Sequence, residues 1–221
     1  MTLLQDLNNA KHISIKFDKN YLASATALYT YILQLHKKVS LVCLEKIDER
    51  FLFLPWFDKI RNSDISSADL KVDLKLSAID LYKLFEENGI KLNQKMATSL
   101  YAGLLLETDG FKNDNVNGMT FAIAKQLLDA KAEYKVCTKF ILKTSSLAYL
   151  RLKSLMLKNM ILTNDATVAT INIDDDNLKS SGAKIDDAYE ILKDVLTLPY
   201  VKEVLLIKKE NKEILKIIKE I

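Results

Sequence analysis

Glycine, histidine, cysteine and arginine are all scarce in this sequence of 221 residues. It contains 5 Gly, 2 His, 2 Cys and 2 Pro, and three of its 32 basic residues are arginine. So few glycines leave no Gly-rich dinucleotide fingerprint and no phosphate loop ending in Gly-Lys-Ser or Gly-Lys-Thr. His12 and His36 belong to no spaced cluster of His, Asp and Glu, which excludes a histidine-rich metal centre. Cys43 and Cys137 lie far apart in the sequence and form neither a metal-ligand pair nor a disulfide framework.

Charge and hydropathy further narrow the class of protein and the kinds of partner to expect. The sequence is 49% hydrophobic and 28% charged, with a net charge of +3, as in ordinary globular proteins. Because nucleic-acid-binding surfaces favour the flat guanidinium fork of arginine, nucleic acid is not an expected partner. No apolar run approaches the roughly 20 residues of a membrane-spanning helix. The first residues have neither the basic start nor the apolar stretch of a secretory signal, so we expect a cytoplasmic protein.

The chain opens with a pattern typical of a parallel sheet. Residues 12–17 and 39–44 have the composition and length of strands, and residues 22–35 between them carry apolar side chains at helical spacing. A strand-helix-strand unit of this kind builds α/β folds. Ligands of such sheets bind at the carboxyl ends of the strands, which here points to the loop 18–21.

A third strand is predicted at residues 70–76. Its apolar and charged residues alternate strictly, which indicates one wet face and therefore a strand at the edge of the sheet. An edge strand offers unpaired backbone groups to another chain, so it is a candidate interaction edge for a protein partner, and a homodimer is left open. The apolar residues of this candidate edge are Leu70, Val72, Leu74 and Leu76.

The remaining sequence alternates between predicted helices and strands. The aromatic run 51–57 is expected to be a packed loop, and the end of the chain, residues 212–221, fits either a hairpin strand or a helix. Helices are predicted from Ser77 to Gly89, from near Asn93 to Thr108, over 120–130, over 147–160 and over 186–196, and strands over 166–173 and 201–207. Together these patterns predict an α/β fold with a small parallel-sheet N-terminal lobe and a smaller α/β C-terminal lobe.

Three segments in order resemble the DHH-type phosphoesterases, in the branch of the bacterial oligoribonucleases and cyclic-dinucleotide phosphodiesterases. Residues 12–24 are similar to the family's first strand, its His-x-Asn-Pro-Asp-Gly-Asp loop and the start of the next helix. Residues 100–111, with Tyr101-Ala102-Gly103, are similar to its Leu-Tyr-Ala-Gly-Ile and Thr-Asp-Thr-Gly-x-Phe run, and residues 166–214 resemble the first part of its C-terminal substrate domain. The resemblance implies lobes at 1–143 and 163–221 joined by a connecting helix at 144–162.

The resemblance also implies what this chain has lost. The family holds two divalent cations that clamp a phosphodiester and generate the attacking hydroxide. At the matching positions Ser14 replaces a histidine, Asp18 is kept, Asn20 replaces an aspartate, and Glu107 stands where the family has aspartate. The Asp-His-His segment and the Gly-Gly-Gly-His segment have no counterpart. We therefore expect no metal and no other cofactor, with Asp18 and Glu107 as vestigial ligand positions.

The residues of the vestigial site have alternative explanations that the sequence leaves open. Asp18 and Asn20 also fit a cap for the following helix, and Asp109 fits a turn before Gly110. Asp174-Asp175-Asp176 fits a solvated helix start better than a calcium loop. A lysine ammonium is expected to replace the cation by pairing with Asp18 or Glu107. The full set that the resemblance assigns to the remnant cleft is Ser14, Lys16, Asp18, Lys19, Asn20, Ser24, Glu107 and Asp109.

Three functions follow from this pattern. The first is a non-catalytic relative, a pseudoenzyme that acts as a protein-interaction, scaffold or chaperone-like factor with a protein partner that the sequence does not identify. The second is a nucleotide or phosphate sensor that uses Lys16, Lys19 and Ser24 without turnover. The third is a working phosphodiesterase on short oligonucleotides or cyclic dinucleotides with an altered metal site.

Overall fold

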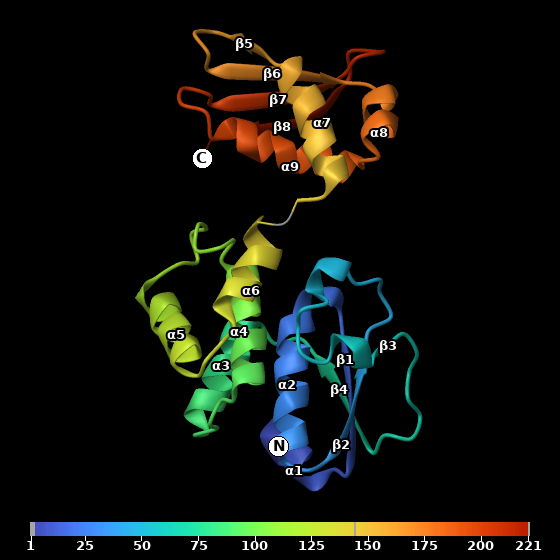
Figure 1. Ribbon diagram of the computed structural model, residues 1–221, viewed down its shortest axis with the longest axis vertical. Helices are drawn as coiled ribbons and strands as arrows, with labels where there is room; N and C mark the ends of the chain where they lie inside the picture. The colour runs from blue at the N-terminus through green and yellow to red at the C-terminus, as the bar shows by residue number, and fades with distance from the viewer. Residues whose placement is uncertain (1–2, 144, 221) are drawn as a thin grey trace. The chain divides into compact units, whose positions relative to one another are not determined.

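The computed structural model describes residues 3–143 and 145–220 and divides the chain into two compact units, Met1–Thr144 and Ser145–Ile221. Each unit has its own hydrophobic core. The α/β fold class predicted from the sequence is confirmed (Figure 1). Among the described residues, no helix has both the length and the hydropathy needed to cross a bilayer.

Unit 1 is built on a four-stranded sheet in the order β3-β2-β1-β4, with all pairs parallel. Helix α2 crosses from β1 to β2 and packs between the sheet and α4 (Figure 1). Its elements are α1 (Leu3–Asn9), β1 (His12–Phe17), η1 (Lys19–Tyr21), α2 (Leu22–Gln34), β2 (Lys38–Val42), η2 (Glu49–Phe51), η3 (Phe57–Lys59), β3 (Ile60–Arg61), β4 (Leu70–Leu74), α3 (Ala78–Glu87), α4 (Gln94–Glu107), α5 (Gly118–Asp129), α6 (Tyr134–Thr138) and the π-helical η4 (Lys139–Lys143).

The sandwiched position of α2 explains its composition. Every residue from Leu22 to Ile32 is buried, so this helix is apolar or small on all sides. Two of its buried hydroxyls donate to carbonyl oxygens of the same helix: that of Thr26 donates to Ala23 at 3.0 Å, and that of Thr30 donates to Thr26 at 2.8 Å. The predicted strand-helix-strand unit is therefore confirmed, with its crossover helix in the core.

The edge position predicted for the third strand is also confirmed, because β4 pairs with β1 alone. The strand ends at Leu74, however, so the prediction that it extends to Leu76 is wrong. Leu70, Val72 and Leu76 pack against the core of unit 1 and Leu74 is fully buried within it. The apolar side chains of the candidate interaction edge therefore serve the core of unit 1, and a partner would meet the strand's backbone.

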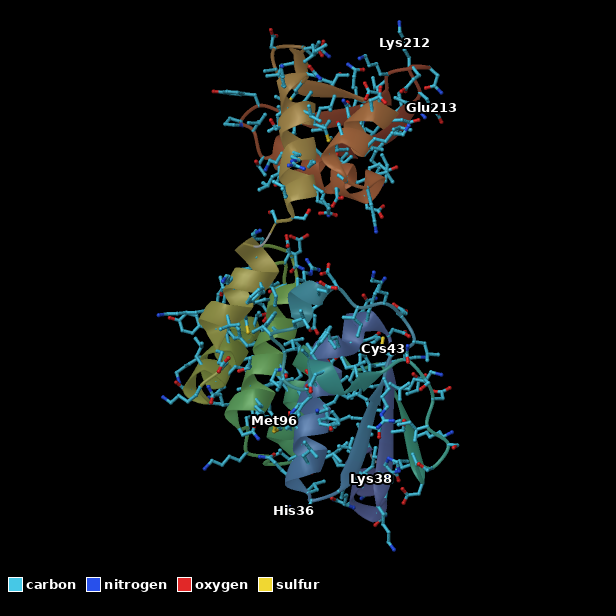
Figure 2. The ribbon with its side chains drawn as sticks, turned by 45° about the vertical axis from the view of Figure 1, so that its right-hand side comes forward. His36, Lys38, Cys43, Met96, Lys212 and Glu213 are labelled. Carbon is cyan, nitrogen blue, oxygen red and sulfur yellow. The ribbon has the colours of Figure 1, made fainter. Side chains whose placement is uncertain are left out.

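Unit 2 has a mixed sheet in the order β5-β6-β7-β8, in which β6 and β7 are parallel and both outer pairs are antiparallel. The strand β8 resolves the open choice in favour of a hairpin with β7; Lys212 and Glu213 mark its turn in Figure 2. Its elements are α7 (Leu147–Lys158), β5 (Ile161–Thr163), β6 (Val168–Ile173), α8 (Asp175–Ser181), α9 (Ile185–Leu196), β7 (Glu203–Lys208) and β8 (Ile214–Lys219).

Two local features of unit 2 bear on the sequence predictions. The Asp174 carboxylate accepts the backbone N–H of Asn177 at 2.7 Å and so caps α8, which confirms the helix start predicted for the acidic run. Helix α7, treated from the sequence as part of a connecting segment over 144–162, packs within unit 2. Leu152 and Met156 on this helix are buried in the core of unit 2. Thr144 lies outside the described residues.

Candidate functional site

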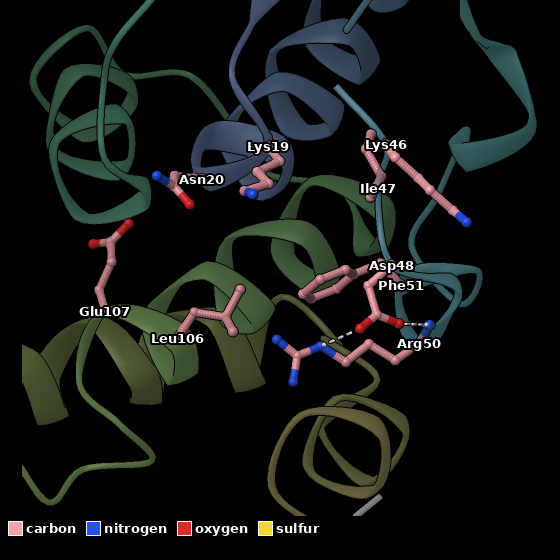
Figure 3. Close-up of a pocket in the computed structure, with 9 residues that line it drawn as sticks. All are labelled: Lys19, Asn20, Lys46, Ile47, Asp48, Arg50, Phe51, Leu106 and Glu107. Atoms are coloured by element: carbon pink, nitrogen blue, oxygen red, sulfur yellow. Dashed lines mark hydrogen bonds and ion pairs between the residues drawn. The ribbon is translucent and has the colours of Figure 1, made fainter. Parts of the chain in front are cut away.

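The candidate site is a pocket of about 570 Å³ in unit 1, at the carboxyl ends of β1 and β2. In Figure 2, Lys38 marks the amino end of β2 and Cys43 its carboxyl end. The loops that follow the two strands, together with the C-terminal end of α4, form its walls (Figure 3). This is the edge at which parallel sheets bind ligands. The residues that line it are Lys19, Asn20, Lys46, Ile47, Asp48, Arg50, Phe51, Leu106 and Glu107.

Three cationic residues are among those that line this pocket: Lys19, Lys46 and Arg50. Lys19 Nζ lies 3.7 Å from a Glu45 carboxylate oxygen, and Arg50 Nε lies 3.8 Å from an Asp48 carboxylate oxygen. The Arg50 guanidinium also lies 4.8 Å from the centre of the Phe51 ring. Figure 3 shows the Asp48–Arg50 pair on one side of the pocket and Lys46 directed away from Glu107. Both ion pairs are long and exposed, so each contributes little to the stability of the fold. Each cation therefore remains able to turn toward an anionic ligand.

Glu107, the last residue of α4, closes the opposite side of the pocket. Its carboxylate accepts the backbone N–H of Ala78 and, at 3.3 Å, that of Ile79. These are the first two residues of α3, and the positive end of a helix favours a negative charge there. Ser77 supplies the other cap, because its hydroxyl oxygen accepts the Asp80 N–H at 3.0 Å. Glu107 is therefore a tertiary cap that fastens the start of α3 to the end of α4.

Burial affects the chemistry of this carboxylate. Desolvation raises the pKa of Glu107 above its ordinary value of 4.5, while the hydrogen bonds from Ala78 and Ile79 oppose that change.

Burial also affects the chemistry of the two thiols of the chain. Cys43 and Cys137 are free and buried, and desolvation raises the pKa of Cys43, and that of Cys137 to about 12. Both thiols therefore remain protonated near neutral pH and have little nucleophilic character.

The structure gathers three of the eight residues assigned to the remnant cleft. Lys19, Asn20 and Glu107 line the pocket, and Figure 3 shows Asn20 opposite Glu107. The other five do not line it. Ser14 and Ser24 are buried in β1 and α2, Lys16 and Asp18 are exposed around the end of β1, and Asp109 is exposed in a left-handed turn after α4.

Two expectations about the charged residues of this site are wrong. Asp18 does not cap the following helix through its side chain: neither it nor Tyr21 makes a side-chain capping bond, and only the Asp18 carbonyl oxygen accepts the Tyr21 N–H, at 2.8 Å. No lysine pairs with Asp18 or Glu107 in the part of the chain that the structure describes. Lys16 pairs instead with Asp64 at 3.4 Å, and Lys19 pairs with Glu45.

The donor set at this end of the sheet does not suit a pair of divalent cations. Within residues 3–143 and 145–220, no three His, Cys, Asp or Glu side chains are placed to hold a metal ion together. The Glu107 oxygens are engaged by backbone N–H groups, which donate hydrogen bonds in the place where a metal would need a bare ligand.

Sequence reasoning missed Lys46, Arg50 and Phe51 as parts of this site. They belong to the loop after β2, whereas the sequence argument considered the loop after β1 alone. The rule that ligands bind at the carboxyl ends of strands applies equally to the neighbouring strand, and it would have found them.

Comparison with known proteins supports the fold. No protein-family model and no curated protein matches the chain. The crystal structure of an exopolyphosphatase-related protein from Bacteroides fragilis is similar, with a TM-score of 0.74 and 14% identity over 96% of this chain and 79% of that one. A Methanococcus jannaschii protein assigned as a family II inorganic pyrophosphatase aligns over 89% of this chain and 84% of its own, with 12% identity and a TM-score of 0.35 that supports no argument.

At 14% identity the first likeness establishes the fold alone. The chain therefore shares the fold of that exopolyphosphatase-related protein. What the chain does with this fold depends on the residues of its own pocket.

Proposed function

We propose that this protein is a non-catalytic relative of the DHH-type phosphoesterases and acts by binding, as a protein-interaction, scaffold or chaperone-like factor. The observation that carries the proposal is the position of Glu107. This residue stands at a ligand position of the family, yet its carboxylate accepts hydrogen bonds from the first two N–H groups of α3.

The charges around Glu107 support the same conclusion. Two divalent cations carry four positive charges, and a site for them needs several carboxylate or imidazole ligands that converge from different strands. Here the N-terminus of α3 and the Lys19 ammonium already supply positive charge to the pocket, and Asp18 is the one family ligand that remains unchanged. Binding of a dication would have to displace the helix cap.

The absence of catalysis is tested by assaying the purified protein for manganese-dependent hydrolysis of short oligonucleotides and cyclic dinucleotides. We expect the same background rate with and without Mn²⁺, and the same rate in an Asp18→Ala variant. Manganese-dependent turnover that disappears in Asp18→Ala would overturn the proposal and support the phosphodiesterase alternative. Metal analysis of the purified protein provides a second readout, and we expect no stoichiometric divalent metal.

The binding role is tested by affinity purification from native cells followed by mass spectrometry. We expect a protein that is retained in near-stoichiometric amounts and that recovers this chain when the partner itself is tagged. If reciprocal purification recovers nothing, the interaction role fails even where catalysis is absent.

A second candidate function is favoured by the cations of the pocket. Lys19 and Arg50 line a cavity large enough for a small ligand, and cationic side chains of this kind recognise phosphate groups. In calorimetry with inorganic phosphate and a panel of nucleotides, a sensor of this type should bind one of these ligands. Lys19→Glu should weaken that binding at least about tenfold, a loss of roughly 1.4 kcal/mol.

Lys16→Glu is the matched control for that experiment. Lys16 is a lysine of the same strand end, but it pairs with Asp64 and does not line the pocket. We expect it to leave the affinity unchanged. If none of the ligands binds, or if Lys16→Glu and Lys19→Glu have equal effects, the sensor function is excluded.

A further inference from the structure

The mixed sheet of unit 2 is covered by helices on one face. The residues of its strands that point toward α7 and α9 are buried in the core of unit 2 or packed against it. The side chains of a strand alternate between the two faces, so their neighbours on β6 and β7 point the other way. On β8 the alternation is interrupted at Leu215, where the register with β7 shifts. The helix-facing residues are Ala169, Ile171 and Ile173 on β6, Val204 and Leu206 on β7, and Leu215 and Ile218 on β8.

The opposite face is apolar over β7 and β8. Residues paired across strands lie on the same face, and the strand register aligns Leu205 of β7 with Ile217 of β8, and Ile207 with Ile214. None of these four side chains belongs to the core of unit 2. Ile214 is 54% exposed and Ile217 is 43% exposed. A sheet with one face in water normally carries polar side chains there, so this apolar surface is suited to a contact.

One charged pair borders these apolar residues. Glu203 of β7 lies opposite Lys219 of β8, and their side chains form an ion pair at 3.2 Å. The β7–β8 patch, which we define as Glu203, Leu205, Ile207, Ile214, Ile217 and Lys219, therefore consists of three cross-strand pairs: one acid with one base, and two pairs of aliphatic residues.

A patch built from such pairs is complementary to a second copy of itself. A two-fold axis that runs parallel to the strands, between β7 and β8, exchanges the positions of the two strands on facing sheets. It places Leu205 against Ile217 of the second copy, Ile207 against Ile214, and Glu203 against Lys219. Aliphatic side chains then meet aliphatic ones, and opposite charges meet at the border.

We propose that this chain forms a homodimer in which the β7–β8 patches of two copies pack face to face. The arrangement is that of two aligned sheets, the packing found in β-sandwiches. Because the patch is small, the dimer is held weakly and its population depends on protein concentration. This inference concerns unit 2 alone and does not depend on the function proposed for the pocket of unit 1.

The test is the molar mass of the full chain, measured by light scattering or sedimentation equilibrium over a wide range of concentration. We expect the mass to rise from that of a monomer toward twice that value. Leu205→Lys and Ile217→Lys should each weaken association at least about tenfold, because each places two ammonium groups in the centre of the contact. Leu150→Lys is the matched control, since Leu150 is 52% exposed on α7, outside the patch.

Charge exchange tests the predicted axis itself. Glu203→Lys and Lys219→Glu should each weaken the homodimer, whereas a mixture of the two single variants should associate. Within each variant the intramolecular pair stays broken, so opposite charges meet only across the axis between the two variants. Circular dichroism and thermal unfolding check that each variant is folded. If Leu205→Lys does not fold, Ile217→Lys and Ile214→Lys test the proposal at more exposed positions.

Two results would overturn the proposal. One is a monomeric mass at every concentration. The other is a dimer that Leu205→Lys and Ile217→Lys leave intact, which would place the contact elsewhere, for instance at the edge of β4.

Discussion

At the scale of single residues, Glu107 shows how one side chain can join the end of one helix to the start of another. A helix start leaves N–H groups without intrahelical partners, and the buried start of α3 needs acceptors for them. The longer arm of glutamate allows the end of α4 to supply two such acceptors. A residue that the family resemblance assigns to metal binding thus stabilises the contact between two helices.

This role predicts a loss of stability when the carboxylate is removed. In Glu107→Ala the N–H groups of Ala78 and Ile79 lose their acceptor in a partly buried place, which should cost about 1–3 kcal/mol in the free energy of unfolding. Chemical denaturation measures that loss. Asp114→Ala is the control, because Asp114 is exposed in the nearby loop, and its effect should stay within about 0.5 kcal/mol. Equal losses in the two variants would show that Glu107 is not a cap.

The pH dependence of stability provides a second residue-scale prediction. Because burial raises the pKa of Glu107, the folded chain holds its proton more tightly than the unfolded chain does. The stabilisation from that proton is complete below the pKa that Glu107 has in the unfolded state, near 4.5. It is lost as pH rises through the raised pKa of the folded state. The Glu107→Gln variant has no titratable group at this position, so it loses no stabilisation over this pH range.

The free energy of unfolding of Glu107→Gln, relative to that of the unchanged protein, should therefore increase as pH rises from about 4 to about 7. Denaturation of both proteins at several pH values measures this difference, in which the contributions of all other groups cancel. A difference that stays constant with pH would contradict the raised pKa.

At the scale of elements, the close packing of α2, α3 and α4 depends on Gly103. A Cβ atom at this position would lie 2.3 Å from the Cβ of Ala78 and 3.0 Å from that of Ala23. Both of those atoms are fixed to their backbones, so neither can move without shifting a helix. The Tyr-Ala-Gly segment, the most specific part of the sequence resemblance, thus has a packing reason in this chain.

Gly103→Ala should therefore destabilise unit 1 by about 1–3 kcal/mol through overpacking, although alanine is the better helix former. Thermal or chemical unfolding measures the change. Gly118→Ala is the matched control, because nothing lies within 4 Å of a Cβ atom at that position at the start of α5. A neutral Gly103→Ala would mean that the three helices tolerate a wider spacing.

At the scale of the whole molecule, the chain has two separate hydrophobic cores. The core of unit 1 joins the parallel sheet to its helices, and the core of unit 2 joins the mixed sheet to α7 and α9. Because local opening depends on the contacts of a cooperative unit, damage to one core should be confined largely to that unit.

Hydrogen exchange of Gly103→Ala tests this division. Amides in β1, β2 and α2 of unit 1 should exchange faster than in the unchanged protein, whereas amides in β6 and β7 of unit 2 should exchange at the same rate. Mass spectrometry of peptic fragments resolves the two sets. Faster exchange throughout the chain would indicate a single cooperative unit.

Most of the fold could be predicted from the sequence because its signals are local. The alternation from Leu70 onward predicted an edge strand, and Ser77 and Gly89 marked the two ends of α3. The short helix α1 and the three-residue strand β5 were missed, since elements this short carry too few residues to show a period. The strand β8 remained ambiguous until its pairing with β7 was known.

The site was predictable only in part. Lys19, Asn20 and Glu107 were found through their places in the sequence, but the pairing of Lys16 with Asp64 and of Lys19 with Glu45 was not, because these partners are distant in the chain. The loop that supplies Lys46 and Arg50 carries no motif. Its contribution follows from the neighbouring position of β2 in the sheet.

The sequence by itself determined the α/β class, the parallel unit at its start and the resemblance to the DHH-type phosphoesterases, because periodicity, caps and short motifs are properties of consecutive residues. The tertiary structure alone decided that Glu107 accepts the N–H groups of α3 and that the outer face of β7 and β8 is apolar and uncovered. Both depend on which backbone groups and which faces of distant segments meet, and folding fixes those contacts through packing.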